Sequence, residues 1–137
     1  MTTRITGGDG FRLANKSKNG REVVILTEPL RWGVESPDGP NFVTVPEGFE
    51  SDFASVPWVA RRLIPSFGPW AKAAVLHDYL YVTLGEGGKW TRKQSDDMFL
   101  QAMTAIADSR EDGEPKRLTR STIHRAVRAF GAGGWGS

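Results

Sequence analysis

A histidine and an aspartate, His77 and Asp78, stand in the middle of a mostly apolar stretch, residues 68–81. A titratable group buried in such a stretch needs a partner, because burial without one is costly or shifts its pKa. Asp96, in a second amphipathic stretch, is the candidate partner of the histidine. A carboxylate on one imidazole nitrogen fixes the tautomer and raises the basicity of the other nitrogen. The pair therefore has the composition of a catalytic general base and the group that orients it.

Residues 49–57 add two further polar side chains, Asp52 and Ser55. Asp52 and Asp78 together could hold a hard divalent cation, since such ions take oxygen ligands. Ser55 could act as a nucleophile for His77, which would complete a serine, histidine and aspartate set. No Gly-x-Ser-x-Gly turn surrounds this serine, so the local sequence does not support that option. Either chemistry requires residues 49–57 to approach the histidine.

A structural role explains the same residues equally well. A histidine on an apolar helix face is often hydrogen-bonded to a carboxylate and holds two helices in register. Asp52 and Ser55 are also residue types that commonly stabilise turns and helix starts. The other histidine, His124, falls on a polar part of its segment, and we expect it at the surface.

The spacing of apolar residues predicts that His77 lies on a helix opened by Pro69 or Trp70. Ala73, His77 and Tyr81 recur on one face of that helix. Because the adjoining face is also mostly apolar, the helix should be central in the fold. The glycine-rich residues 85–88 should reverse the chain direction.

A second helix should begin after Thr91, because Thr91 and Gln94 match a capping box. Asp96 lies at the edge of the buried face of this helix, whereas Asp97 points away. Arg92, four residues before Asp96, can form an ion pair with it. A short loop favours an antiparallel pair of helices, in which His77 and Asp96 face each other.

The rest of the chain predicts an α+β fold, with a small N-terminal antiparallel sheet packed against a C-terminal three-helix bundle. β-branched and alternating segments indicate strands at 22–27, 30–34 and 41–45, with turn residues at 36–40, and the third helix is expected at 119–130. We expect one domain over residues 1–137, strand-rich at 10–57, helical at 69–131 and glycine-rich at 132–137.

Composition restricts the classes of function. The 137 residues are 39% apolar and 25% charged, with a net charge of +2, which does not predict a nucleic-acid partner. The absence of cysteine excludes disulfides and thiolate metal sites and fits a reducing cytoplasm. No apolar run is long enough for a membrane span, and the N-terminal residues do not resemble a signal peptide.

Five motifs occur in order along residues 28–131. They are Val-Pro-x-Gly-Phe, Ser-Asp-Phe-Ala-Ser-Val-Pro, Ala-Ala-Val-Leu-His-Asp-Tyr-Leu-Tyr, Arg-x-x-x-Asp-x-x-Phe and Ala-Val-Arg-x-Phe-Gly. This order resembles a family of unknown function that is common in tailed bacteriophages and prophages. The resemblance implies a phage or prophage origin and supplies no activity.

The helix pair also resembles that of the phospholipases A2, through His-Asp-x-x-Tyr followed by Asp-x-x-Phe. This resemblance implies that His77 activates water, Asp78 binds calcium and Asp96 orients His77, with Tyr81 supporting the network. Residues 64–70 contain one glycine and two prolines where that family has a glycine-rich calcium loop. A divalent cation would therefore need Asp52 as an additional ligand.

We therefore expect a phage or prophage protein with a histidine–aspartate hydrolase-like site that acts on the host envelope, on a lipid ester first and on peptidoglycan second. The alternative is a non-catalytic virion component of the tail or tail tip, and a small host-interaction protein is a third class. Phage structural proteins or envelope components are the expected partners, in the host cytoplasm during assembly or in the virion.

Trp135 and the tail should pack on another chain or fold back over the helices, since tryptophan favours interfaces. The alternative is that the tryptophans complete a small core.

Overall fold

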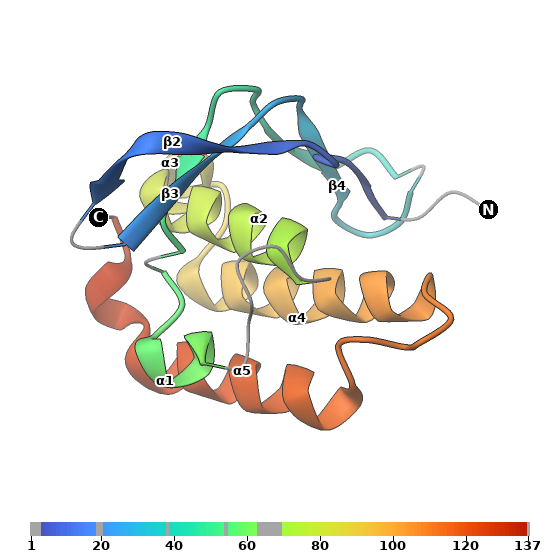
Figure 1. The fold of residues 1–137 in the computed structure, drawn as a ribbon. Coiled ribbons are helices and arrows are strands. Elements are labelled where there is room, and N and C mark those ends of the chain that lie inside the picture. The colour runs from blue at the N-terminus through green and yellow to red at the C-terminus, as the bar shows by residue number, and fades with distance from the viewer. Residues whose placement is uncertain (1–3, 19–20, 38, 54, 63–69, 137) are drawn as a thin grey trace. The chain divides into compact units, whose positions relative to one another are not determined.

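The computed structural model describes residues 4–18, 21–37, 39–53, 55–62 and 70–136 (Figure 1). The chain divides into two compact units, Met1–Asp52 and Phe53–Ser137. The first contains strands and the second contains helices, which confirms the α+β class. Each unit is described below by itself.

The strand unit contains two antiparallel sheets within its described ranges, whereas we expected one. One sheet has the order β1-β4-β5 and the other the order β2-β3-β6. The six strands are β1 (Ile5–Gly7), β2 (Phe11–Lys18), β3 (Arg21–Leu26), β4 (Leu30–Gly33), β5 (Phe42–Val45) and β6 (Glu50–Ser51). The predicted hairpin is confirmed, since Leu30 pairs with Val45 and Trp32 with Val43. The strands β1, β2 and β6 were not predicted, because they are short or rich in polar residues.

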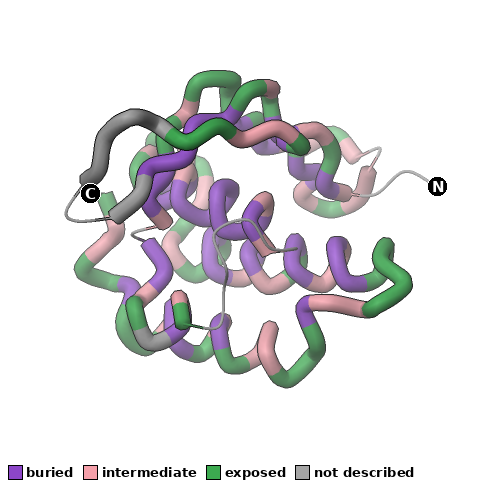
Figure 2. Tube along the Cα trace, viewed as in Figure 1, coloured by how far each residue is buried: buried purple, intermediate pink, exposed green. Residues whose placement is uncertain are grey.

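The helical unit contains α1 (Trp58–Arg61), α2 (Ala71–Val82), α4 (Arg92–Asp108), α5 (Arg117–Phe130) and the short 3₁₀ helix η1 (Ala132–Gly134). The three long helices confirm the predicted ones, and α1 was not predicted. The helix α2 is largely buried, with nine of its twelve residues buried (Figure 2). Pro69, one of its two predicted openers, lies outside the described residues, and Trp70 is its N-cap. We identify no helix in the described ranges with the length and apolar content needed to cross a bilayer.

The helices α2 and α4 run antiparallel and contact each other, and α4 also contacts α5 (Figure 1). The start of α4 is fixed by the predicted capping box. The Thr91 hydroxyl accepts a hydrogen bond from the Gln94 amide at 3.0 Å, and the Gln94 side chain accepts one from the Thr91 amide at 2.9 Å. Two orphan amides are thereby satisfied, so α4 begins at a defined residue.

The segment labelled α3, Leu84–Gly88, is a left-handed turn and not a right-handed helix. Its φ angles are 54° at Leu84, 69° at Gly85, 59° at Glu86, 75° at Gly87 and 94° at Gly88. Glycine adopts such angles readily, but a leucine or a glutamate there is strained. At Gly85 a Cβ would also lie 1.8 Å from the Trp90 carbonyl oxygen, so no side chain fits. The predicted chain reversal is therefore confirmed, in an unusual conformation.

Candidate functional site

The centre of the candidate site is the predicted pair His77 and Asp96. His77 on α2 lies with Nε2 2.7 Å from Oδ1 of Asp96 on α4. Both side chains are completely buried, at 0% exposure. The imidazole is further enclosed by rings, with Phe99 stacked at 4.5 Å and Tyr81 tilted at 4.3 Å between centroids. The expected contact across an antiparallel helix pair is therefore confirmed.

Asp96 receives hydrogen bonds from three further side chains. The Tyr81 hydroxyl donates to Oδ1 at 2.6 Å, and Arg128 on α5 donates to Oδ2 at 2.7 Å. Arg92, the predicted local partner, approaches Oδ2 at 3.5 Å. Burial alone would raise the pKa of Asp96, but the hydrogen bonds from His77, Tyr81 and Arg128 outweigh burial and lower that pKa. The carboxylate is therefore anionic and compensated by neighbouring donors.

The second nitrogen of the histidine is also occupied. Ser55 Oγ lies 2.9 Å from Nδ1 of His77, and the Ser55 backbone amide donates to Oδ1 of Asp78 at 3.1 Å. Because ionised Asp96 only accepts, Nε2 carries the proton that it binds and Nδ1 is left to accept from the serine hydroxyl. Ser55, His77 and Asp96 therefore form one continuous hydrogen-bonded chain.

The protonation state of His77 follows from its surroundings. Burial lowers the pKa of His77, against the hydrogen bond and charge of Asp96, which raise it. The imidazole is therefore neutral near pH 7 and able to accept a proton at Nδ1. Burial likewise raises the pKa of Tyr81, so this hydroxyl remains a donor to Asp96.

The two predicted metal ligands, Asp78 and Asp52, are both buried. Asp78 is buried and binds the Ser55 amide. Asp52 lies directly after β6 in the strand unit and is also buried, and its approach to His77 remains a prediction. Within the described ranges, no three histidine or acidic side chains are arranged to hold a metal ion.

The second histidine, His124, is partly exposed and lies 2.9 Å from Asp97, which also pairs with Lys93 at 2.8 Å. The prediction that Asp97 points away from the histidine helix is therefore consistent with its partners. This partly exposed cluster links α4 to α5 and shares no hydrogen bond with Asp96 among those described.

Sequence reasoning did not assign Arg128 or Gly131 to the site. A Cβ at Gly131 would lie 2.7 Å from the Tyr81 hydroxyl oxygen, so only glycine fits against the network. Both residues belong to the Ala-Val-Arg-x-Phe-Gly motif, which was noted only for its resemblance. The sequence feature that could have assigned them is an arginine and a glycine at the end of a helix, in a chain whose buried carboxylate needs a positive charge nearby.

Comparison with protein families matches residues 25–127 to the family described as "Protein of unknown function (DUF1353)". This match covers most of the chain. The chain belongs to this family. The DUF1353 match includes Ser55, His77 and Asp96 and ends one residue before Arg128. No curated protein and no solved structure matched the chain, so membership of DUF1353 leaves the activity to be argued from the site.

Proposed function

We propose that this DUF1353 member is a phage or prophage protein with a hydrolase-like site that acts on the host envelope. His77 is the general base, Asp96 orients it, Tyr81 supports the pair and Ser55 is the nucleophile. The observation that carries the proposal is the chain from Ser55 Oγ to His77 Nδ1 at 2.9 Å and from His77 Nε2 to Asp96 at 2.7 Å. The phage origin rests on the resemblances described above. So does the ranking of the candidate substrates, with a lipid ester first and peptidoglycan second.

The chain has the order of groups that acyl transfer requires. Ser55 Oγ attacks the substrate carbonyl carbon while its proton passes to His77 Nδ1. The imidazolium, stabilised by Asp96, then gives that proton to the leaving group. Water, deprotonated by the same nitrogen, hydrolyses the acyl-serine and restores the hydroxyl. Serine proteases bind serine at Nε2 and aspartate at Nδ1, and here the two nitrogens are exchanged.

A divalent cation at Asp78 and Asp52 remains a separate prediction. No step of the serine mechanism passes through it. The mechanism does require that Ser55, 4% exposed here, becomes accessible to the substrate.

A fluorophosphonate serine probe tests the proposal, because it reacts only with an activated and accessible serine. We expect a covalent adduct on the peptide that contains Ser55 in the wild type. Ser55→Ala and His77→Gln should lose that adduct, and Ser109→Ala, at an exposed serine, should retain it. A folded wild type that remains unlabelled at Ser55 would rule out the serine mechanism.

A second candidate function, a non-catalytic virion component of the tail or its tip, is favoured by a different observation. His77 and Asp96 are both 0% exposed, and both nitrogens and both carboxylate oxygens already have partners. A sealed and satisfied polar cluster is what a structural core requires. In that case Ser55 is a core partner and does not react with the probe.

A further inference from the structure

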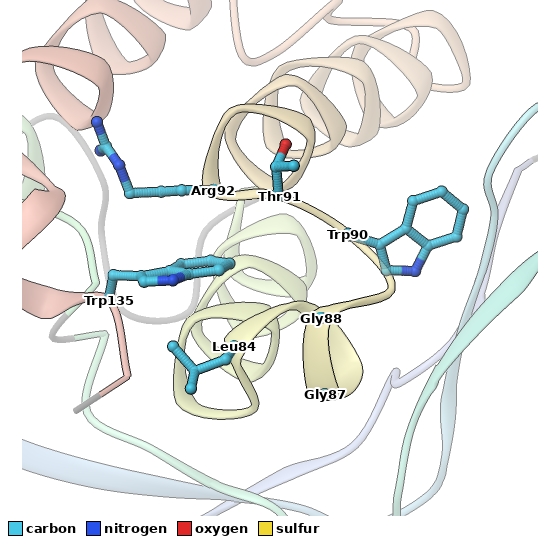
Figure 3. A pocket seen from close by; sticks show the side chains of 7 residues that line it. All are labelled: Leu84, Gly87, Gly88, Trp90, Thr91, Arg92 and Trp135. Atoms are coloured by element: carbon cyan, nitrogen blue, oxygen red, sulfur yellow. The ribbon is translucent and has the colours of Figure 1, made fainter.

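An open pocket of about 590 Å³ lies where the turn after α2 meets the start of α4 (Figure 3). Its volume is within the range of small-molecule sites. Its lining residues come from the left-handed turn, the start of α4 and the C-terminal tail: Leu84, Gly87, Gly88, Trp90, Thr91, Arg92 and Trp135.

The wall formed by Trp135 is fixed before any ligand arrives. The Trp135 and Tyr81 rings pack in a T-shaped arrangement, at 5.0 Å between centroids. The next residue, Gly136, donates its amide to the Tyr81 carbonyl at 2.9 Å. The tail therefore folds back onto α2, which confirms that alternative within this chain, and holds one indole face at the pocket (Figure 3). A preformed wall avoids the ordering cost of binding.

The left-handed turn supplies further lining residues. Leu84 lies beside Trp135 in Figure 3, with its backbone in the strained left-handed region. A Cβ at Gly87 or Gly88 would meet nothing within 4 Å, so the backbone there is open to a ligand. Strained residues of this kind occur preferentially at ligand-binding sites.

The charge of the pocket limits the ligand class. Arg92 is the only charged residue among those that line it. Its guanidinium turns away toward α5, where it donates to the carbonyls of Val127 at 3.1 Å and Arg128 at 3.3 Å (Figure 3). The pocket therefore presents an indole face, the apolar Arg92 stem and open glycine backbone, whereas the Thr91 hydroxyl points into the first turn of α4 as its cap. Such a surface suits an uncharged ligand with one flat apolar face and a polar edge.

We infer that this pocket binds a sugar ring of an envelope glycan, stacked on Trp135. A pyranose ring has an apolar C–H face that suits the indole, and its edge carries hydroxyl groups that suit the open glycine backbone. An acyl chain prefers an enclosed apolar cavity, whereas this pocket is open. The inference rests on the proposed envelope target and not on the serine chemistry.

Chitotriose, the soluble trimer of N-acetylglucosamine, is the test ligand. We expect its titration to shift the Trp135 indole N–H signal of the wild type saturably in NMR spectra, and to leave the Trp58 signal unchanged. Trp135→Ala should weaken binding at least tenfold, whereas Trp58→Ala, at an exposed tryptophan outside the pocket, should bind like the wild type. Ser55→Ala should also bind like the wild type, so failure of the serine mechanism is distinguishable from failure here.

Two results would overturn the inference. One is a Trp135 signal that does not move up to about 10 mM chitotriose. Any binding would then be weaker than that of a weak specific site with a Kd in the millimolar range. The other is selective shifting of Trp135 by a proline-rich peptide or by a lysophospholipid and not by the sugar. Because the wild-type spectrum gives the first readout, the test does not depend on the folding of Trp135→Ala.

Discussion

Tyr81 and His77 share a single oxygen atom of Asp96. The tyrosine hydroxyl donates to Oδ1 at 2.6 Å, and the imidazole nitrogen lies 2.7 Å from the same atom. The two residues are one helical turn apart on α2, so the spacing that places them on one face also brings both to the same carboxylate. Donation by Tyr81 stabilises the anionic form of Asp96 that orients the imidazole.

Tyr81→Phe should lower the free energy of unfolding by about 1–3 kcal/mol, because it removes a buried hydrogen bond to a charged group. The ring and its contact with Trp135 are retained. Tyr79→Phe is the matched control, since the Tyr79 hydroxyl is partly buried and 3.5 Å from Glu86. Denaturant melts of both variants provide the measurement, and equal effects would contradict a special role for Tyr81.

His77→Gln separates catalysis from structure. If His77 is the base, the variant should fold like the wild type and lose hydrolysis of liposomes or purified sacculi. If His77 only stabilises the helix pair through its hydrogen bond to Asp96, the variant leaves Asp96 with an altered partner and should lose about 1–3 kcal/mol of stability. Thermal melts and both activity assays are run together. If the wild type is inactive on both substrates and the variant is destabilised, the enzymatic role of His77 is ruled out.

Arg128→Met should destabilise the protein by about 1–3 kcal/mol, because it leaves one oxygen of a buried carboxylate without its nearest cation. The pKa of Asp96 should rise as that donor is lost. Arg125→Met, at an exposed arginine of the same helix, should be nearly neutral. Urea titrations of the two variants give the comparison, and similar midpoints would show that Arg128 is dispensable.

Stability should fall on acidification below about pH 6.5, the ordinary pKa of histidine. Burial lowers the pKa of His77 in the folded state, so the unfolded chain binds more protons and stability rises with pH in this range. The contribution of His77 is complete above the unfolded pKa and disappears as pH falls toward the folded one. Melts of the wild type and His77→Gln between pH 5 and 8 check this, because the variant should show a shallower pH dependence.

Deletion of residues 132–137 should lower the melting temperature. The deletion removes the Trp135 contact with Tyr81 and the hydrogen bond from Gly136 to the Tyr81 carbonyl. Gly133→Ala, where a Cβ would meet nothing within 4 Å, is the control for the tail. If the truncated protein kept its melting temperature and the NMR signals of Tyr81, the tail would not be part of the folded unit.

The helical part of the fold was predictable because its signals are local. Apolar spacing predicted α2, and the pair Thr91 and Gln94 predicted the start of α4 within one residue. The weak strands β1 and β6 were not predictable, since three or two residues carry too little pattern to separate them from loops.

The same distinction applies to the candidate site. His77, Asp96 and Tyr81 were predictable together, because helical spacing and the cost of burying a charge both indicate partners. Arg128 comes from a third helix and reaches Asp96 only through tertiary packing, which helical spacing does not encode. Ser55 could be nominated by residue type, but its contact with His77 depends on how the chain before α1 folds.

The Asp96 carboxylate is contacted by side chains from α2, α4 and α5. Detachment of α2 or α5 from α4 would remove at least one donor from an anion that has no exposure to solvent. Partial opening is therefore more costly here than the fraying of an ordinary helix end. The three helices should accordingly exchange their most protected amide hydrogens with deuterium as one cooperative unit, with a single free energy of opening.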